Sequence, residues 1–334
     1  MKYLLLTILL AGLCVRANAQ TTISNIDDQT VCDQNPNPPD PYGNPDCYNT
    51  NLQEWAWISE VNDPGGGIGC ESPNGCHVTG NMSQGCVYCL DGQSLQMNIV
   101  NPGETCSPQP GEGCYSDVQF MNRLYTDDTA SGAGYLTTDM WATTDSTGTQ
   151  DNENLEYSLE QDVTDPSPGT SDRYVYGLSC NNLDNGSIWQ VWWGDYVNQG
   201  GSLGEWTPAT WNGGQTIPCL QFYPTLFTHL IFHFQQVNNS NCNVCTKYID
   251  FTVVQYNPND PSCSDPNTQQ PCVYYYPLDS NMIFGGLAQW PNWGAGLITA
   301  MQLDGDWNDD QYSVWADNWA VCYAPPGPTN PCSN

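Results

Sequence analysis

Residues 155–163 read Leu155-Glu156-Tyr157-Ser158-Leu159-Glu160-Gln161-Asp162-Val163, and this stretch decides the fold class. Apolar side chains occupy nearly every second position, and the positions between them are polar or acidic. A period of two places alternate side chains on opposite faces of an extended chain. The pattern is therefore typical of a β-strand with one buried face and one outward, acidic face.

Similar strand-like patterns recur along the chain. Short runs rich in Tyr, Trp, Val and Thr alternate with clusters of Gly, Pro, Asn and Asp, and no long helical period interrupts them. We predict an all-β fold, a two-sheet antiparallel β-sandwich rich in disulfides. The expected strands are Gly134–Thr143, Leu155–Val163, Arg173–Cys180, Ser187–Trp193, Thr228–Val237, Lys247–Gln255, Gly296–Leu303 and Tyr312–Tyr323.

Residues 1–19 have the pattern of a secretory signal peptide. Lys2 is followed by an apolar run and by Ala17-Asn18-Ala19, a site of the kind that signal peptidase cleaves before Gln20. A lipid anchor at Cys14 is disfavoured because Leu13 precedes it. No later apolar stretch approaches the roughly 18 residues of a membrane helix. We expect a secreted or cell-surface protein without a membrane span.

The cysteine count agrees with export. Of 17 cysteines, Cys14 lies in the signal, and the remaining 16 could form eight disulfides. Spacing suggests the local pairs 32–47, 70–76, 106–114, 263–272 and 322–332, and Cys180 and Cys219 could join more distant strands, although connectivity does not follow from sequence. Two Cys-x-x-Cys pairs, at 86–89 and 242–245, could be zinc or redox motifs but fit plain disulfides better. Because Leu90 follows Cys89, haem attachment through Cys-x-x-Cys-His is excluded.

Charge limits the partners. The chain has 36 acidic and five basic residues, and Lys2 and Arg16 lie in the signal, so residues 20–334 carry 3 − 36 = −33. Such a charge repels nucleic acid and anionic membranes, whereas cations, neutral polymers and basic partners remain possible. It could equally serve only to keep an extracellular protein soluble. No phosphate-binding loop is present, so no nucleotide cofactor is expected.

We expect one sandwich domain over residues 20–324. The segment 32–114 is rich in Cys, Pro and Gly and is interpreted as the first strands with elaborated loops, because residues 22–26 look like an edge strand; a separate small domain is the alternative. Residues 325–334 form a Pro-rich tail tethered by Cys332.

Seven motifs in order resemble exported bacterial proteins of the concanavalin A-like lectin/glucanase superfamily, over about residues 118–323. They are Leu159-Glu160-Gln161-Asp162-Val163, Tyr174-Val175-Tyr176-Gly177-Leu178-Ser179-Cys180, Ile188-Trp189-Gln190-Val191-Trp192, Ile217-Pro218-Cys219, Thr228-His229-Leu230-Ile231-Phe232-His233-Phe234, Ala300-Met301-Gln302-Leu303-Asp304-Gly305 and Tyr312-Ser313-Val314-Trp315-Ala316-Asp317-Asn318. The resemblance implies a jelly-roll sandwich. Because relatives of this fold include both enzymes and binding proteins, it only suggests an activity.

The acidic strand is the candidate catalytic element. Family-16 glucanases of this fold carry Glu-x-Asp-x-Glu, whose outer glutamates act as nucleophile and general acid. Here Ser158 replaces the central Asp in the frame starting at Glu156, and Thr164 replaces the last acid in the frame starting at Glu160. If the protein were a glycoside hydrolase, Glu156, Glu160 and Asp162 would be its catalytic residues. A solvated acidic face is the simpler interpretation.

Aromatic side chains are a second signal, since indole faces stack on sugar rings. The candidate carbohydrate-binding residues are Trp192, Trp193, Trp290, Trp293, Glu160 and Asp162. Core packing would explain many of these tryptophans equally well. Because Trp189 and Trp192 lie on opposite faces of their strand, at least one should belong to the core.

An acidic loop suggests structural Ca²⁺. Oxygen-bearing side chains stand at alternate positions in Asp304, Asp306, Asn308 and Asp310, without the Gly and Glu of an EF-hand. Asp317 in the last strand could share an ion with the N-terminal strand through Asp27 or Asp28, as in jelly-roll carbohydrate-binding modules. An Asp-rich turn without metal is the alternative. His229 and His233, about 13 Å apart on one strand face, are too distant to bind one metal together.

These patterns favour an exported, non-catalytic protein that binds an extracellular glycan. A glucanase-type hydrolase and a self-assembling structural surface protein remain the alternatives.

Overall fold

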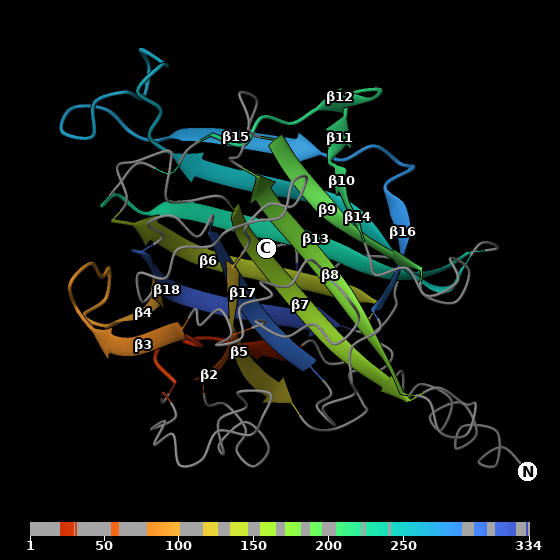
Figure 1. Ribbon diagram of the computed structural model, residues 1–334. Coiled ribbons are helices and arrows are strands. Elements are labelled where there is room, and N and C mark those ends of the chain that lie inside the picture. Colours follow the sequence, from red (N-terminus) through yellow and green to blue (C-terminus); the bar gives the residue numbers. More distant parts are fainter. Residues whose placement is uncertain are drawn as a thin grey trace, which may run out of the picture.

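The structure is a computed structural model (Figure 1). It describes residues 21–29, 31, 55–59, 79–100, 116–125, 134–145, 154–164, 171–181, 188–195, 205–220, 222, 225–239, 242–288, 297–305, 311–324 and 332. Every regular element in these ranges is a β-strand. In the described ranges, therefore, no helix could cross a membrane.

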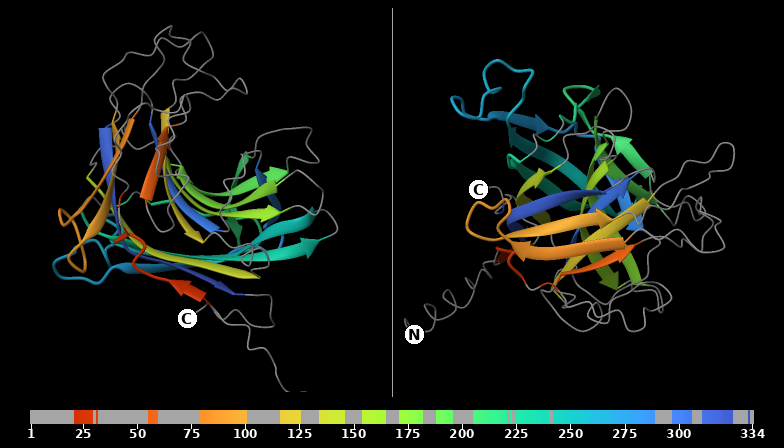
Figure 2. Two further views of the ribbon diagram at one scale, coloured as in Figure 1. Left: turned by 90° about the horizontal axis from the view of Figure 1, so that it is seen from below. Right: turned by 60° about the vertical axis from the view of Figure 1, so that its left-hand side comes forward.

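The strands form two large sheets. The front sheet runs in the order β2 (Trp55–Ser59), β5 (Ser116–Tyr125), β17 (Leu297–Gly305), β7 (Asn154–Thr164), β8 (Ser171–Asn181) and β9 (Ile188–Asp195), with β10 (Glu205–Pro208) beside β9. The back sheet runs in the order β15 (Cys272–Pro277), β14 (Cys242–Gln255), β13 (Thr228–Asn239), β6 (Tyr135–Thr144), β18 (Gln311–Ala324), β4 (Ser94–Val100) and β3 (Thr79–Gly85). In the left view of Figure 2, β7–β9 (green) and β13–β14 (teal) lie in two stacked layers.

Four short strands lie outside these two runs. β16 (Ile283–Ala288) pairs with β14 through its first half and with β8 and β9 through its second, so it joins the two sheets. β1 (Thr21–Ile23) pairs with the C-terminal end of β18. β11 (Thr210–Trp211) and β12 (Gln215–Thr216) form a separate small hairpin.

The core fills the space between the sheets. Phe232 and Phe234 of β13 are fully buried and meet Tyr157 of β7 and Tyr176 of β8, with the Tyr157 and Phe232 rings 5.5 Å apart. Trp319 packs on Trp55 from the opposite sheet at 5.1 Å. The alternation read from residues 155–163 is confirmed, because Tyr157 and Leu159 face this core.

All eight expected strands are present, and their ends differ from the expected ones by at most two residues except in β14, which begins at Cys242 rather than Lys247. The all-β, two-sheet antiparallel sandwich is therefore confirmed. Strands also lie in the segment 32–114: β2 joins the front sheet, and β3 and β4 form a hairpin on the back sheet.

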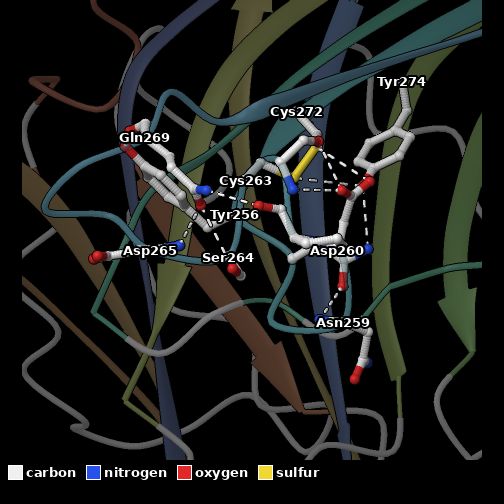
Figure 3. The surroundings of a disulfide bond; sticks show 12 residues. Tyr256, Asn259, Asp260, Cys263, Ser264, Asp265, Gln269, Cys272 and Tyr274 are labelled. Carbon is white, nitrogen blue, oxygen red and sulfur yellow. Dashed lines mark hydrogen bonds between the residues drawn. A yellow bond between two sulfur atoms is a disulfide. The ribbon is translucent and has the colours of Figure 1, made fainter.

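Four predicted disulfides are confirmed: Cys86–Cys89, Cys180–Cys219, Cys263–Cys272 and Cys322–Cys332. Cys245 is disulfide-bonded as well. Figure 3 shows the loop closed by Cys263–Cys272, where Gln269 accepts a hydrogen bond from the Asp265 N–H at 2.8 Å and donates one to the Pro261 carbonyl at 2.7 Å. The pairs proposed for 32–47, 70–76 and 106–114 lie outside the described residues.

Candidate functional site

The acidic strand β7 lies in the middle of the front sheet, between β17 and β8. Its Glu156, Ser158 and Glu160 lie on the face turned away from the core, as the alternation predicts. Glu156 and Ser158 are half-buried. The centre of this outer face is the candidate functional site.

Glu160 departs from the expectation of a solvated acid, because its side chain has no exposed surface. Its Oε1 accepts hydrogen bonds from Ser158 Oγ at 2.9 Å and from Gln119 Nε2 of β5 at 3.2 Å. Ser158, which stands where the glucanase motif has an acid, therefore acts here as a donor to its neighbour. In the conformation described, the Glu160 carboxylate is therefore enclosed and engaged by its neighbours.

A tryptophan platform lies beside the acidic strand. Trp206 of β10 pairs directly with Trp192 of β9, and their rings meet edge to face at 5.3 Å. A Cβ placed on Gly177 of β8 would lie 2.8 Å from the Trp206 ring and 2.9 Å from the Trp192 Cβ. The missing side chain of Gly177 therefore lets Trp206 lie against the sheet surface. We call Gly177, Trp192 and Trp206 the front-sheet platform.

A core tyrosine fixes the backbone beneath the platform. The hydroxyl of Tyr248, from β14 of the opposite sheet, accepts the Gly177 N–H at 3.2 Å and donates to the Trp192 carbonyl at 2.9 Å. Burial raises the pKa of Tyr248, so the hydroxyl stays protonated and can donate. The platform is therefore anchored through the whole thickness of the sandwich.

A row of polar side chains crosses the sheet next to the platform. Cross-strand neighbours on five successive strands supply Gln119, Gln302, Glu156, Ser179 and Gln190. Gln119 and Ser179 are buried, whereas Gln302, Glu156 and Gln190 are half-buried. The amides and the carboxylate of these three residues are groups that exchange hydrogen bonds with sugar hydroxyls. An indole half-exposed beside such a polar row offers both halves of sugar recognition: ring stacking and directional hydrogen bonds.

The described side chains can be compared with the geometry of a retaining hydrolase. A retaining glycosidase needs two carboxyl groups that both reach the substrate, about 5–5.5 Å apart. Of the three candidate catalytic residues, Glu156 is half-buried, Glu160 is enclosed, and the side chain of Asp162 is not among those described. Glu160 has no surface with which to touch a glycosidic oxygen.

The predicted site residues are only partly brought together. Trp192 lies at the site, 91% buried, while for Trp193, Asp162 and Asp304 only the strand backbone is described. Trp290, Trp293, Asp306, Asn308 and Asp310 lie outside the described residues. Trp206 belongs to the tryptophans that the sequence offers for sugar stacking, but Gly177, Gln190 and Gln302 do not stand out in the sequence, because only the strand register reveals that they are its neighbours.

Asp317 lies far from the front-sheet platform, at a bulge in β18 where Asn318 adopts a φ of 51°. It has no exposed surface, and neither has Asp27 of the N-terminal segment. Asp27 Oδ1 accepts the Trp319 N–H at 2.7 Å, and Asp317 Oδ2 accepts the Leu90 N–H at 2.5 Å. The second oxygen of each carboxylate is buried without a hydrogen-bond partner.

The environment of these two acids opposes their ionisation. Burial raises the pKa of Asp27 from 3.8 to about 6, and repulsion from Asp28 and Asp317 adds to the rise. The pKa of Asp317 is also raised, first by burial and then by repulsion from Asp91 and Asp28. Orphaned carboxylate oxygens surrounded by further acids match the donor set of a hard cation such as Ca²⁺. The residues therefore fit the expected ion.

Two other candidate metal sites are accounted for without metal. His229 and His233 lie on one outer face of the back sheet, as predicted, and each ring nitrogen contacts a carboxylate at 2.5 Å, from Asp139 and Asp250 respectively. Asp260, Cys263 and Cys272 also bring ligand atoms together within the described ranges, but both sulfurs belong to one disulfide. Neither sulfur can therefore bind as a thiolate.

No protein-family model matches the chain, and no curated protein does. Solved structures with similar folds include lectin II from Ulex europaeus, at 8% identity with a TM-score of 0.32, covering 81% of this chain and 99% of the lectin. The Ca²⁺/Man3GlcNAc-bound exoplasmic/lumenal domain of VIP36 is 11% identical with a TM-score of 0.33, covering 82% and 90%. A native glycosidic hydrolase is 12% identical with a TM-score of 0.37, covering 93% and 97%. The proposals below rest on this chain's own residues.

Proposed function

We propose that the protein is exported and binds an extracellular glycan, without cleaving it, on the outer face of the front sheet. The observation that carries the proposal is the front-sheet platform beside the polar row. Trp206 provides the stacking surface, and Glu156, Gln190 and Gln302 are placed to exchange hydrogen bonds with sugar hydroxyls. Trp290, Trp293 and Asp162 remain proposed contributors. Strand alternation from the core residue Val191 argues against Trp193 as a contributor on this face.

We propose binding without cleavage because Glu160 is buried. Its carboxylate is enclosed and is hydrogen-bonded by Ser158 and Gln119, so it lacks the access that a nucleophile or a general acid requires. Glucanase-type hydrolysis through Glu156, Glu160 and Asp162 is the second candidate, favoured by their shared face on β7. A self-assembling surface protein is the third.

We further propose Ca²⁺ as a structural ion bound by Asp27 and Asp317. The buried, unpartnered oxygens of these residues support it, and Asp28 and Asp91 contribute negative charge nearby. The predicted loop site with Asp304, Asp306, Asn308 and Asp310 stays a separate proposal.

A binding assay with one matched control tests the lectin proposal. We expect a glycan array to reveal a ligand. Calorimetry then measures the affinity of the protein for that ligand and for β-1,3- and β-1,4-glucan oligosaccharides. Trp206→Ala should weaken glycan binding at least tenfold, since a lost stacking surface contributes about 1.4 kcal/mol or more. Trp141→Ala, a half-buried tryptophan on the back sheet, should leave the affinity within twofold.

Reducing-sugar release separates the alternatives. Wild type and Glu160→Gln should both show background hydrolysis of β-glucans. Clear turnover that disappears in the Glu160→Gln protein would establish the hydrolase instead, and equal loss of binding in the two tryptophan variants would remove the platform as the binding site.

A further inference from the structure

The outer face of the back sheet, on the opposite side of the sandwich, contains a pocket of about 460 Å³. Four adjacent strands line it: Tyr135 comes from β6, His233 and Gln235 from β13, Lys247, Ile249 and Asp250 from β14, and Tyr275 from β15. Its volume falls in the range of about 300–1,000 Å³ that is usual for small-molecule sites. We call it the back-sheet pocket.

Part of the lining is held rigidly by one carboxylate. Asp250 Oδ1 contacts His233 Nδ1 at 2.5 Å, and Asp250 Oδ2 accepts a hydrogen bond from the Tyr275 hydroxyl at 3.3 Å. Both oxygens of Asp250 are therefore already engaged. The Tyr275 ring, 55% exposed, is fixed at the pocket as an aromatic surface.

Lys247 is the unusual member of the lining. It is one of only three basic residues after position 19, in a chain with 36 acids. Among the described residues, no carboxylate forms an ion pair with its ammonium group. The side chain is half-buried, and the one carboxylate in the same lining, Asp250, is engaged by His233 and Tyr275 instead.

The chemistry of the pocket selects the ligand. The single ammonium of Lys247 matches a single carboxylate, whereas the net charge of the chain opposes a phosphate dianion or any ligand that presents several negative charges to one pocket. Tyr275 and Ile249 offer apolar contact for the face of a sugar ring, and Gln235 and His233 offer hydrogen bonds to hydroxyls. We propose that the back-sheet pocket binds a hexuronic acid residue of an acidic glycan, with Lys247 pairing with its carboxylate.

This proposal does not rest on the front-sheet site, since the face, the ligand and the test variants all differ. The probes are trisaccharides of galacturonic acid and of glucuronic acid, each compared with the same trisaccharide methyl-esterified at its carboxyl groups. Esterification keeps the ring and hydroxyls but removes the charge. Calorimetry should show that the intact protein binds one or both acids at least tenfold more tightly than the matching ester.

Three variants then locate the effect. Lys247→Gln should abolish the preference for acid over ester, while Lys247→Arg should retain most of it because the positive charge remains. Gln215→Glu, on the exposed hairpin strand β12, lowers the net charge by one as Lys247→Gln does. It should leave the affinity for the acidic trisaccharide within twofold of wild type. If Lys247→Gln fails to fold, Tyr275→Ala, at a largely exposed position, should weaken acid binding at least fivefold.

Three results would overturn the proposal. One is equal affinity of the intact protein for acid and ester, or no binding of either acid at millimolar concentration. Another is an unchanged acid preference in Lys247→Gln. The third is equal weakening by Gln215→Glu, which would mean that overall charge rather than the pocket governs the interaction.

Discussion

Gly177 is the residue on which the geometry of the front-sheet platform depends most directly. Its neighbours approach so closely that a methyl group would lie 2.8 Å from the Trp206 ring and 2.9 Å from the Trp192 Cβ. The Trp192 Cβ is fixed to the backbone, which Tyr248 holds from below. The indole of Trp206 is therefore the group that must move.

We predict that Gly177→Ala displaces Trp206 and so weakens glycan binding at least tenfold, with a loss of unfolding free energy of about 1–3 kcal/mol for the added volume. Calorimetry and chemical denaturation measure the two effects. Gly85→Ala is the matched control, because a Cβ there meets nothing within 4 Å. If both alanine variants kept full binding, the fit between glycine and indole would have no functional consequence.

At the scale of elements, the sequence predicts the long strands well because each has one face in the core. β13 and β18 show clear alternation, and their predicted bounds differ from the structure by no more than two residues. β16 was missed, since its Gly285 and Gly286 have no side chains to set a period and it divides its pairing between two sheets. β10, only four residues long, contains too little pattern to detect.

The site was less predictable than the fold, for a related reason. Alternation places Glu156, Ser158 and Glu160 on one face, and the structure agrees. Burial of Glu160 depends on Gln119, which is 41 residues away, and the platform depends on pairing between β9 and β10. Register between distant strands follows from the packing of the whole sheet, which no local pattern contains.

The disulfides connect elements over different spans, which predicts different contributions to stability. Cys180–Cys219 joins the end of β8 to the segment after β12 across 39 residues, whereas Cys263–Cys272 closes a loop across nine. Restriction of the unfolded chain increases with loop length. Replacing both cysteines by alanine should lower the free energy of unfolding by about 4 kcal/mol for the first pair and about 2–3 kcal/mol for the second.

Denaturant titration under non-reducing conditions measures both double variants. The two pairs are similar in burial, because Cys180, Cys219 and Cys263 are buried and Cys272 is half-buried. A larger loss for the 263–272 variant than for the 180–219 variant would show that local packing, rather than chain restriction, determines the contribution.

At the scale of the whole molecule, electrostatic repulsion is the dominant liability. A formal charge of −33 on residues 20–334 destabilises any compact state, and the three basic residues cannot offset it. The repulsion is concentrated where the N-terminal segment, the loop after β3 and the last strand meet, at Asp27, Asp91 and Asp317. The Cys86–Cys89 disulfide lies in the loop after β3, just before Leu90, and the Leu90 N–H donates a hydrogen bond to Asp317 Oδ2. A cation there would hold the N-terminal segment and the loop after β3 against β18.

The expected dependence on pH follows from the raised pKa values. Without metal, Asp27 binds its proton more tightly in the folded state than in the unfolded chain. The contribution of this proton to the free energy of unfolding is therefore complete below about pH 4 and is lost as the pH rises through about 6. Asp317 acts in the same direction. Ca²⁺ requires the ionised carboxylates and competes with these protons, so its stabilising effect should grow over the same interval.

We therefore predict that the melting temperature in millimolar Ca²⁺ is several degrees higher than in chelator at pH 7.5, and that the difference is much smaller at pH 5. A Ca²⁺ concentration one hundred times Kd adds about 2.7 kcal/mol to the free energy of unfolding. Asp317→Asn should abolish the calcium shift, yet in chelator at pH 7.5 it should be at least as stable as wild type, because it removes a buried charge and keeps the shape. Asp145→Asn removes one charge from an exposed position and should keep the full shift. Equal melting temperatures in calcium and chelator at matched ionic strength would show that Asp27 and Asp317 are stabilised by their protons alone.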